Sequence, residues 1–79
     1  MAGQTRQVLQ KIDRQLADAG TNKSRLLAAT VYLSNMSMKD EMNRVWIDWI
    51  DPQNPPTRAA VGVALTPDTL VEIVVIAAK

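Results

Sequence analysis

The sequence predicts an α+β fold in which helices cover one face of a mixed β-sheet. Two segments repeat apolar residues at three- and four-residue spacing, which is the helical period. Three others are short, apolar and rich in β-branched residues, as strands are. The resulting order is helix, strand, helix, strand, strand. A strand–helix–strand unit forms a parallel crossover and places its helix against the sheet, so we expect both helices on one face.

The first helix is expected from about residue 4 to residue 19. Its apolar positions follow the helical spacing and are Val8, Leu9, Ile12, Leu16 and Ala19. Gly20 stands just after the last turn, where glycine commonly ends helices. The opposite face is polar, and we expect it to be solvated rather than to bind a partner.

The segment Leu26–Leu33 is expected to be a strand buried on both faces, because it is apolar and carries β-branched Thr30 and Val31. A second helix is expected from about Met38 to Trp49, with Ser37 as its N-cap residue. Its apolar stripe consists of Met42, Val45, Trp46 and Trp49. A stripe at this spacing is typical of a helix packed on a core.

Residues 51–57 contain three of the four prolines and predict a rigid, extended connection that ends the second helix. The remaining strands are expected at about 58–65 and 70–78, joined by residues 66–69. Taken from these residues alone, the last two strands would pair as a hairpin. Residues 1–79 are expected to form one domain.

Composition excludes several classes of site. Without cysteine or histidine, the chain can form neither the usual zinc sites nor a Ser–His–Asp triad, so any chemistry must rest on carboxylates, arginine, lysine, hydroxyl groups and the backbone. With 79 residues, it is short for a large core, and association with other chains is the expected source of additional stability. A net charge of +1 argues against a dedicated nucleic-acid binder.

The N-terminal residues lack the basic-then-apolar pattern of a signal peptide. No apolar run approaches the roughly 20 residues of a membrane span. We therefore expect a cytoplasmic protein without membrane contact.

Two charged residues stand inside apolar, strand-like runs: Arg58 and Glu72. A charge in a dry site costs several kcal/mol unless it is paired or faces a ligand. Arg58 follows a Pro-Pro pair at a strand entrance, where a guanidinium is either a two-pronged carboxylate receptor or one half of a salt bridge. Glu72 is either a carboxylate that activates water, with a pKa raised by its apolar neighbours, or a solvent-facing charge on an edge strand.

An ordered set of short motifs runs through the chain: Gln4-Thr5-x-Gln7-x-Leu9, Ala29–Leu33, Met42-Asn43, Pro56-Thr57-Arg58 and Val71-Glu72-Ile73. Together they resemble the reactive-intermediate deaminase (RidA, YjgF-like) family. That resemblance implies a chorismate-mutase-like mixed sheet with Leu26–Leu33 between the last two strands, and without the N-terminal hairpin of the family. It also implies a homotrimer with pockets between subunits.

The function that the resemblance implies is hydrolysis of reactive 2-imino acids to 2-keto acids and ammonia, without a metal or an organic cofactor. Arg58 would bind the substrate carboxylate, Glu72 would activate water, and Asn43 would orient part of the pocket; a lone helical asparagine is otherwise more often solvated. Two alternatives remain open. One is a non-catalytic subunit that binds a small molecule or a partner, and the other is an RNA-active, endoribonuclease-like protein.

Overall fold

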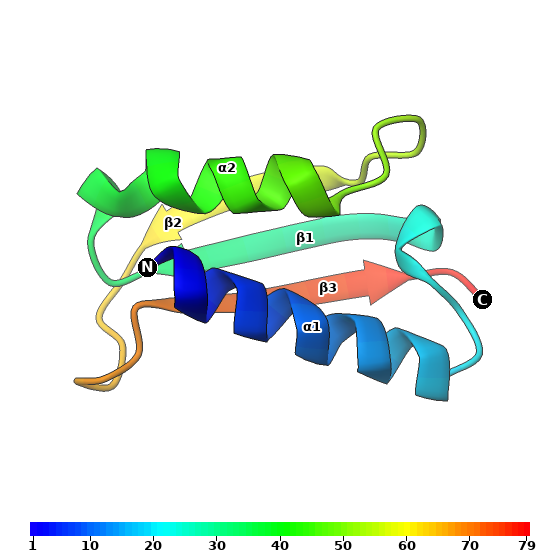
Figure 1. Ribbon diagram of the computed structural model, residues 1–79, viewed down its shortest axis with the longest axis horizontal. Coiled ribbons are helices and arrows are strands. Elements are labelled where there is room, and N and C mark those ends of the chain that lie inside the picture. Colours follow the sequence, from blue (N-terminus) through cyan, green and yellow to red (C-terminus); the bar gives the residue numbers. More distant parts are fainter.

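The computed structural model describes residues 1–79 and has the predicted α+β class. Its helices are α1 (Ala2–Asp18) and α2 (Lys39–Trp49), and its strands are β1 (Leu26–Leu33), β2 (Thr57–Gly62) and β3 (Val71–Ala77). Short 3-10 turns precede β1 and α2. Both helices lie on the same face of the sheet, with α1 over β3 and α2 over β2 (Figure 1).

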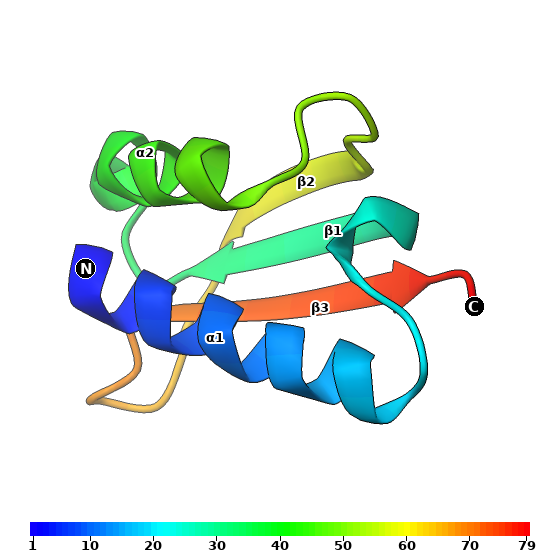
Figure 2. The same cartoon turned by 45° about the vertical axis from the view of Figure 1, so that its right-hand side comes forward.

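The strand order is β2-β1-β3, with β2 parallel and β3 antiparallel to β1. The central position of β1 is therefore the one that the family resemblance implied, and the hairpin predicted from the residues alone is wrong (Figure 2). The connection between β2 and β3 passes the end of β1 instead of turning back tightly. Two backbone hydrogen bonds hold it there: Val63 N donates to Leu33 O (2.9 Å), and Ser34 N donates to Leu70 O (3.1 Å).

Several predicted boundaries need correction. The strand expected to reach residue 65 ends at Gly62, because β1 ends at Leu33, the residue paired with Gly62. Ser37 does not cap α2; it lies in the 3-10 turn, whose backbone is capped by the side chain of Asn35 (Oδ1 to Ser37 N, 2.9 Å). The prediction for Gly20 is confirmed, because this residue adopts a positive φ of 81° just after the C-cap of α1.

The core lies between the helix layer and one face of the sheet. It contains Leu9, Ile12 and Leu16 of α1, Met42, Val45 and Trp46 of α2, and Leu26, Ala29, Val31, Leu33 and Val71 of the sheet. The apolar stripes predicted for both helices are thus confirmed, except that Ala19 is exposed.

The second face of the sheet is uncovered. Ala28, Thr30 and Tyr32 are only half-buried there, so the prediction that β1 is buried on both faces is wrong. The exposed large apolar residues of the strands and their extensions are Leu27, Val61, Val63, Val74 and Ile76.

The chain contains no helix that is both long and apolar enough to span a bilayer.

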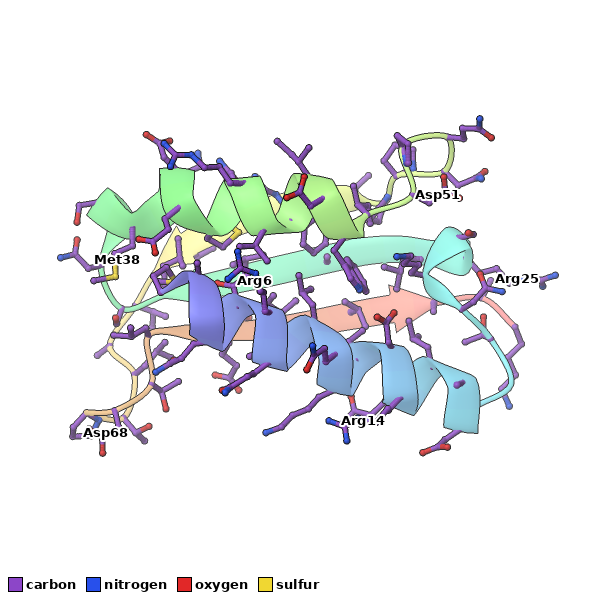
Figure 3. The ribbon with its side chains drawn as sticks, in the orientation of Figure 1. Arg6, Arg14, Arg25, Met38, Asp51 and Asp68 are labelled. Carbon is purple, nitrogen blue, oxygen red and sulfur yellow. The ribbon has the colours of Figure 1, made fainter.

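A polar clamp fixes the start of α1 to the connection between β2 and β3. The side-chain amide of Gln4 donates to Asp68 O (2.8 Å) and accepts from Leu70 N (2.9 Å). Figure 3 shows Asp68 at the tip of this connection, while Arg14 extends from the outer side of α1. Gln4, the first residue of the first motif, therefore links the helix to the segment that leads into β3.

Candidate functional site

Arg58 is the second residue of β2, and its side chain points into the helix layer. It pairs with Ala29 of β1, which is buried under the helices, and neighbours in register share a face of the sheet. The guanidinium lies against α2. Its Cζ is 5.5 Å from the ring centroid of Trp46, and its Nη1 donates to Met42 Sδ at 3.7 Å. The Pro-rich connection thus leads directly into a strand that carries Arg58 beneath α2.

Arg58 has no carboxylate partner in the chain. The only ion pair joins the amino group of Met1 to Glu41, 3.9 Å apart. The salt-bridge alternative considered for Arg58 is therefore wrong for this chain. A guanidinium presents five N–H donors, and a thioether sulfur is a weak acceptor, so most of its hydrogen-bonding capacity is unused. A half-buried, unneutralised guanidinium of this kind is suited to receive an anion.

Glu72 lies on the other side of the sheet. It pairs with Tyr32 and alternates with Val74 and Ile76 on the uncovered face, where its side chain is exposed. It also borders a hollow of about 530 Å³ between α1 and the outer edge of β3. Polar neighbours around this hollow are Lys11, Gln15, Thr66 and Thr69. In the isolated chain, Glu72 is thus a solvent-accessible charge on an edge strand.

Arg58 and Glu72 do not converge within one copy of the chain. Their partners on β1, Ala29 and Tyr32, are three residues apart, and β2 and β3 lie on either side of β1. With about 3.3 Å per residue and roughly 4.8 Å per strand spacing, the two Cα atoms are separated by about 14 Å. Their side chains also point to opposite faces. A small substrate cannot contact both groups of one copy.

Asn43 follows Met42 on α2, and its side-chain Oδ1 is buried without a hydrogen-bond partner. Such orphaned acceptors are rare in native proteins and normally find a donor in a ligand, a water or a neighbouring chain. The sequence-based expectation that this asparagine is simply solvated is therefore wrong for its oxygen. Asn43 thus directly follows Met42, the residue of α2 that accepts the hydrogen bond from Arg58 of β2.

Sequence reasoning missed the residues that contact Arg58. It assigned Met42 and Trp46 to the core, and both are buried, at 0% and 7% exposure. Their four-residue spacing places them on one face of α2, but nothing in the sequence indicated that β2 would bring an arginine to that face.

The chain has no cluster of three or more histidine, cysteine or acidic residues that would bind a metal ion.

Comparison with known proteins gives one consistent family. The model of the family described as endoribonuclease L-PSP matches residues 1–79. A RutC family protein of Haemophilus ducreyi is 54% identical over 76 residues, which cover 95% of this chain and 65% of that protein. The chain thus spans about two thirds of the length of this curated relative.

Solved structures agree with this assignment. A member of the YjgF protein family from Neisseria meningitidis superimposes with a TM-score of 0.93 at 42% identity, covering 95% of this chain and 64% of that one. The Rid family protein YyfA of Yersinia pestis gives a TM-score of 0.89 at 37% identity, covering 95% and 60%. The similarity therefore includes both the sequence and the arrangement of helices and strands.

Proposed function

This chain belongs to the RidA/YjgF family, whose matching model is described as endoribonuclease L-PSP, and from that premise we propose that it hydrolyses reactive 2-imino acids. The products are the corresponding 2-keto acid and ammonia. The substrate class is a small molecule with a carboxylate next to a C=N bond. No metal or organic cofactor takes part in the proposed reaction.

The observation that carries the proposal is the unpaired guanidinium of Arg58. It lies beneath α2 without any acidic partner, against a sulfur and an aromatic ring. A carboxylate would receive paired, charge-assisted hydrogen bonds from it, which are among the strongest in proteins. Asn43, the next residue after Met42 on α2, has a buried oxygen without a donor, which supports a nearby ligand or neighbouring chain that supplies one.

The proposed chemistry needs one proton shuttle. The substrate reacts as the protonated imine, C=NH₂⁺. Glu72 removes one proton from the water whose oxygen adds to the imine carbon, so that the nitrogen becomes a neutral amine, and Glu72 then returns this proton to the nitrogen. The C–N bond breaks with its electron pair on the leaving ammonia, the C=O bond forms, and the ammonia takes the proton of the former hydroxyl group and leaves as ammonium. One carboxylate serves as base and then as acid, so it is regenerated in each cycle.

Because Arg58 and Glu72 of one copy are about 14 Å apart and on opposite faces, they would act on one substrate from different copies. We propose a homotrimer with its sites between subunits. The uncovered sheet face supports association, since Val61, Val74 and Ile76 are exposed there at 42%, 51% and 61%. No cavity in the single chain contains Arg58, which agrees with a site that another copy completes.

The test compares turnover of freshly generated 2-iminobutanoate and binding of 2-ketobutanoate in the native protein and Arg58→Ala. A large decrease in both turnover and affinity in the variant, with an unchanged melting temperature, supports the proposal. Binding without turnover in the native protein would indicate the non-catalytic alternative instead. If neither ligand binds, the proposal is wrong.

The name of the matching family model also makes RNA cleavage a second candidate. A protein that binds RNA through phosphate contacts loses affinity steeply as salt rises. Cleavage of a single-stranded RNA probe, with such salt dependence and no imine turnover, would favour this alternative.

A further inference from the structure

We infer that Trp46, together with Met42, is the positioning residue for Arg58, holding the guanidinium ready for a carboxylate while leaving its donors free. This inference rests on the proposed function of Arg58. It adds a role for two residues of α2 that do not themselves contact the substrate.

The two α2 side chains that contact the guanidinium are held in place by burial. Met42 and Trp46 are almost entirely buried, whereas Arg58 is only half-buried. A free arginine side chain carries about 2 kcal/mol of rotamer entropy, which is lost when a ligand immobilises it. A cation within about 6 Å of an aromatic centroid is attracted to the ring, and the Cζ of Arg58 lies 5.5 Å from that of Trp46. Part of the ordering cost is therefore met before the ligand arrives.

The contacts with Trp46 and Met42 leave Arg58 better able to bind a ligand than a salt bridge to an acidic residue would. A carboxylate would neutralise the guanidinium and occupy its paired donors, as in an ordinary salt bridge. An aromatic ring attracts the charge without accepting a conventional hydrogen bond, and the sulfur of Met42 engages only Nη1, at 3.7 Å. Arg58 thus stays positively charged and available to an incoming carboxylate.

The orientation of Trp46 is itself fixed by α1. Its ring packs on Trp49 with centroids 5.5 Å apart and planes tilted by 51°. The Nε1–H of Trp49 donates to Asp13 Oδ2 of α1 at 2.8 Å. A chain of contacts therefore runs from α1 through both indole rings to Arg58, so that the site depends on the docking of the two helices.

The test uses Trp46→Phe, which keeps an aromatic face, and Trp46→Leu, which keeps an apolar side chain without one. Affinity for 2-ketobutanoate is measured by calorimetry for each variant. We expect about a twofold loss for Trp46→Phe and about a fivefold to tenfold loss for Trp46→Leu, the range of a partly desolvated cation–π contact. Repeating Trp46→Leu in the Arg58→Ala background should produce no further loss. Met42→Leu, a volume-conserving change, folds normally and should weaken binding about twofold.

A second measurement needs no ligand. In the NMR spectrum of the free protein, the side-chain NH and CH₂ signals of Arg58 should be shifted by the Trp46 ring current. This shift should persist in part in Trp46→Phe and vanish in Trp46→Leu, with Arg14 as an exposed control whose signals stay unchanged.

The two measurements separate the failures. If the native protein does not bind 2-ketobutanoate but the ring-current shift is present, the proposed function is wrong. The contact between Arg58 and Trp46 is then confirmed, but it does not position Arg58 for this ligand. If binding depends on Arg58 but Trp46→Leu has the native affinity, or lowers it equally in the Arg58→Ala background, the positioning role is overturned. Absence of the ring-current shift in the native protein also overturns it.

Discussion

Replacing Arg58 by lysine is expected to remove most of the turnover of a carboxylate substrate while leaving the fold intact. Lysine keeps the positive charge but ends in a compact ammonium, which cannot reproduce the paired donors of a guanidinium. The side chain at this position is half-buried and makes no ion pair, and its head group donates a hydrogen bond to Met42 Sδ and lies over the Trp46 ring. The change therefore acts on the site more than on stability.

The magnitude follows from these contacts. One charge-assisted hydrogen bond contributes about 1.5 to 3 kcal/mol, and lysine retains one of the two that a carboxylate would receive. A loss of about 1.5 to 3 kcal/mol corresponds to roughly a 12-fold to 150-fold decrease in kcat/KM. Because no intramolecular ion pair is lost, the free energy of unfolding should change by no more than about 1 kcal/mol.

Steady-state kinetics with 2-iminobutanoate measures the first quantity, and thermal unfolding measures the second. Arg14→Lys is the matched control, because it makes the same chemical change on the exposed side of α1 (Figure 3). The control should keep native kinetics. An unchanged kcat/KM in Arg58→Lys, in a protein that does turn over the imine, would refute the carboxylate-receptor interpretation.

Three further outcomes are expected. Glu72→Gln should lower kcat more than it weakens binding of 2-ketobutanoate, because an amide keeps the shape of the side chain but cannot accept a proton; equal losses in both quantities would assign Glu72 to binding or folding. Hydrogen bonds from Gln53 N (3.0 Å), Asn54 Nδ2 (3.1 Å) and Ser24 Oγ (2.8 Å) lower the pKa of Asp51 from 3.8. The stabilisation linked to this shift is present above pH 3.8 and is lost as the pH falls through the lower pKa of the folded state. Asp51→Asn should therefore flatten the profile of melting temperature against pH below about pH 4, and a profile identical to that of the native protein would contradict this. The 79-residue chain by itself should associate at micromolar concentration, because the outer edge of β3 is unpaired and apolar residues are exposed on the open sheet face; a single monomeric species in sedimentation, with cooperative melting, would show that this edge is protected in another way.

Sequence periodicity predicted the helices and β1 closely, and the reason is physical. The stripes of α1 and α2 are long enough to define a face, and the bounds of β1 agree with its apolar run. Strand order was not available from the residues alone. A hairpin and a split pair around β1 bury similar side chains, and the choice depends on backbone hydrogen bonds at Leu33 and Leu70, which have no side-chain signature.

The candidate site was only partly predictable for a related reason. A charge in an apolar run shows that a residue needs explanation, but not which face of the sheet it occupies. Arg58 and Glu72 gave the same sequence signal, yet one contacts the helix layer and the other lies on the open face. The contact of Arg58 with Trp46 requires the packing of β2 under α2, which no local pattern encodes. The burial of the Asn43 oxygen likewise becomes visible only in the folded chain.

The separation of Arg58 from Glu72 makes assembly a condition of the proposed chemistry rather than an addition to it. A guanidinium that binds a carboxylate lies within hydrogen-bond distance of it, and a carboxylate that activates water must lie within one water of the imine carbon. For a three- or four-carbon substrate, these demands bring both groups within a few ångströms of one molecule. Side chains about 14 Å apart at their Cα atoms and on opposite faces of one sheet cannot meet them together. If Glu72 is the proton shuttle, a neighbouring copy must supply it, and mixing Arg58→Ala subunits with Glu72→Gln subunits should restore activity that neither variant has alone. Mixed assemblies without activity, formed from variants that still associate, would exclude Glu72 as the shuttle.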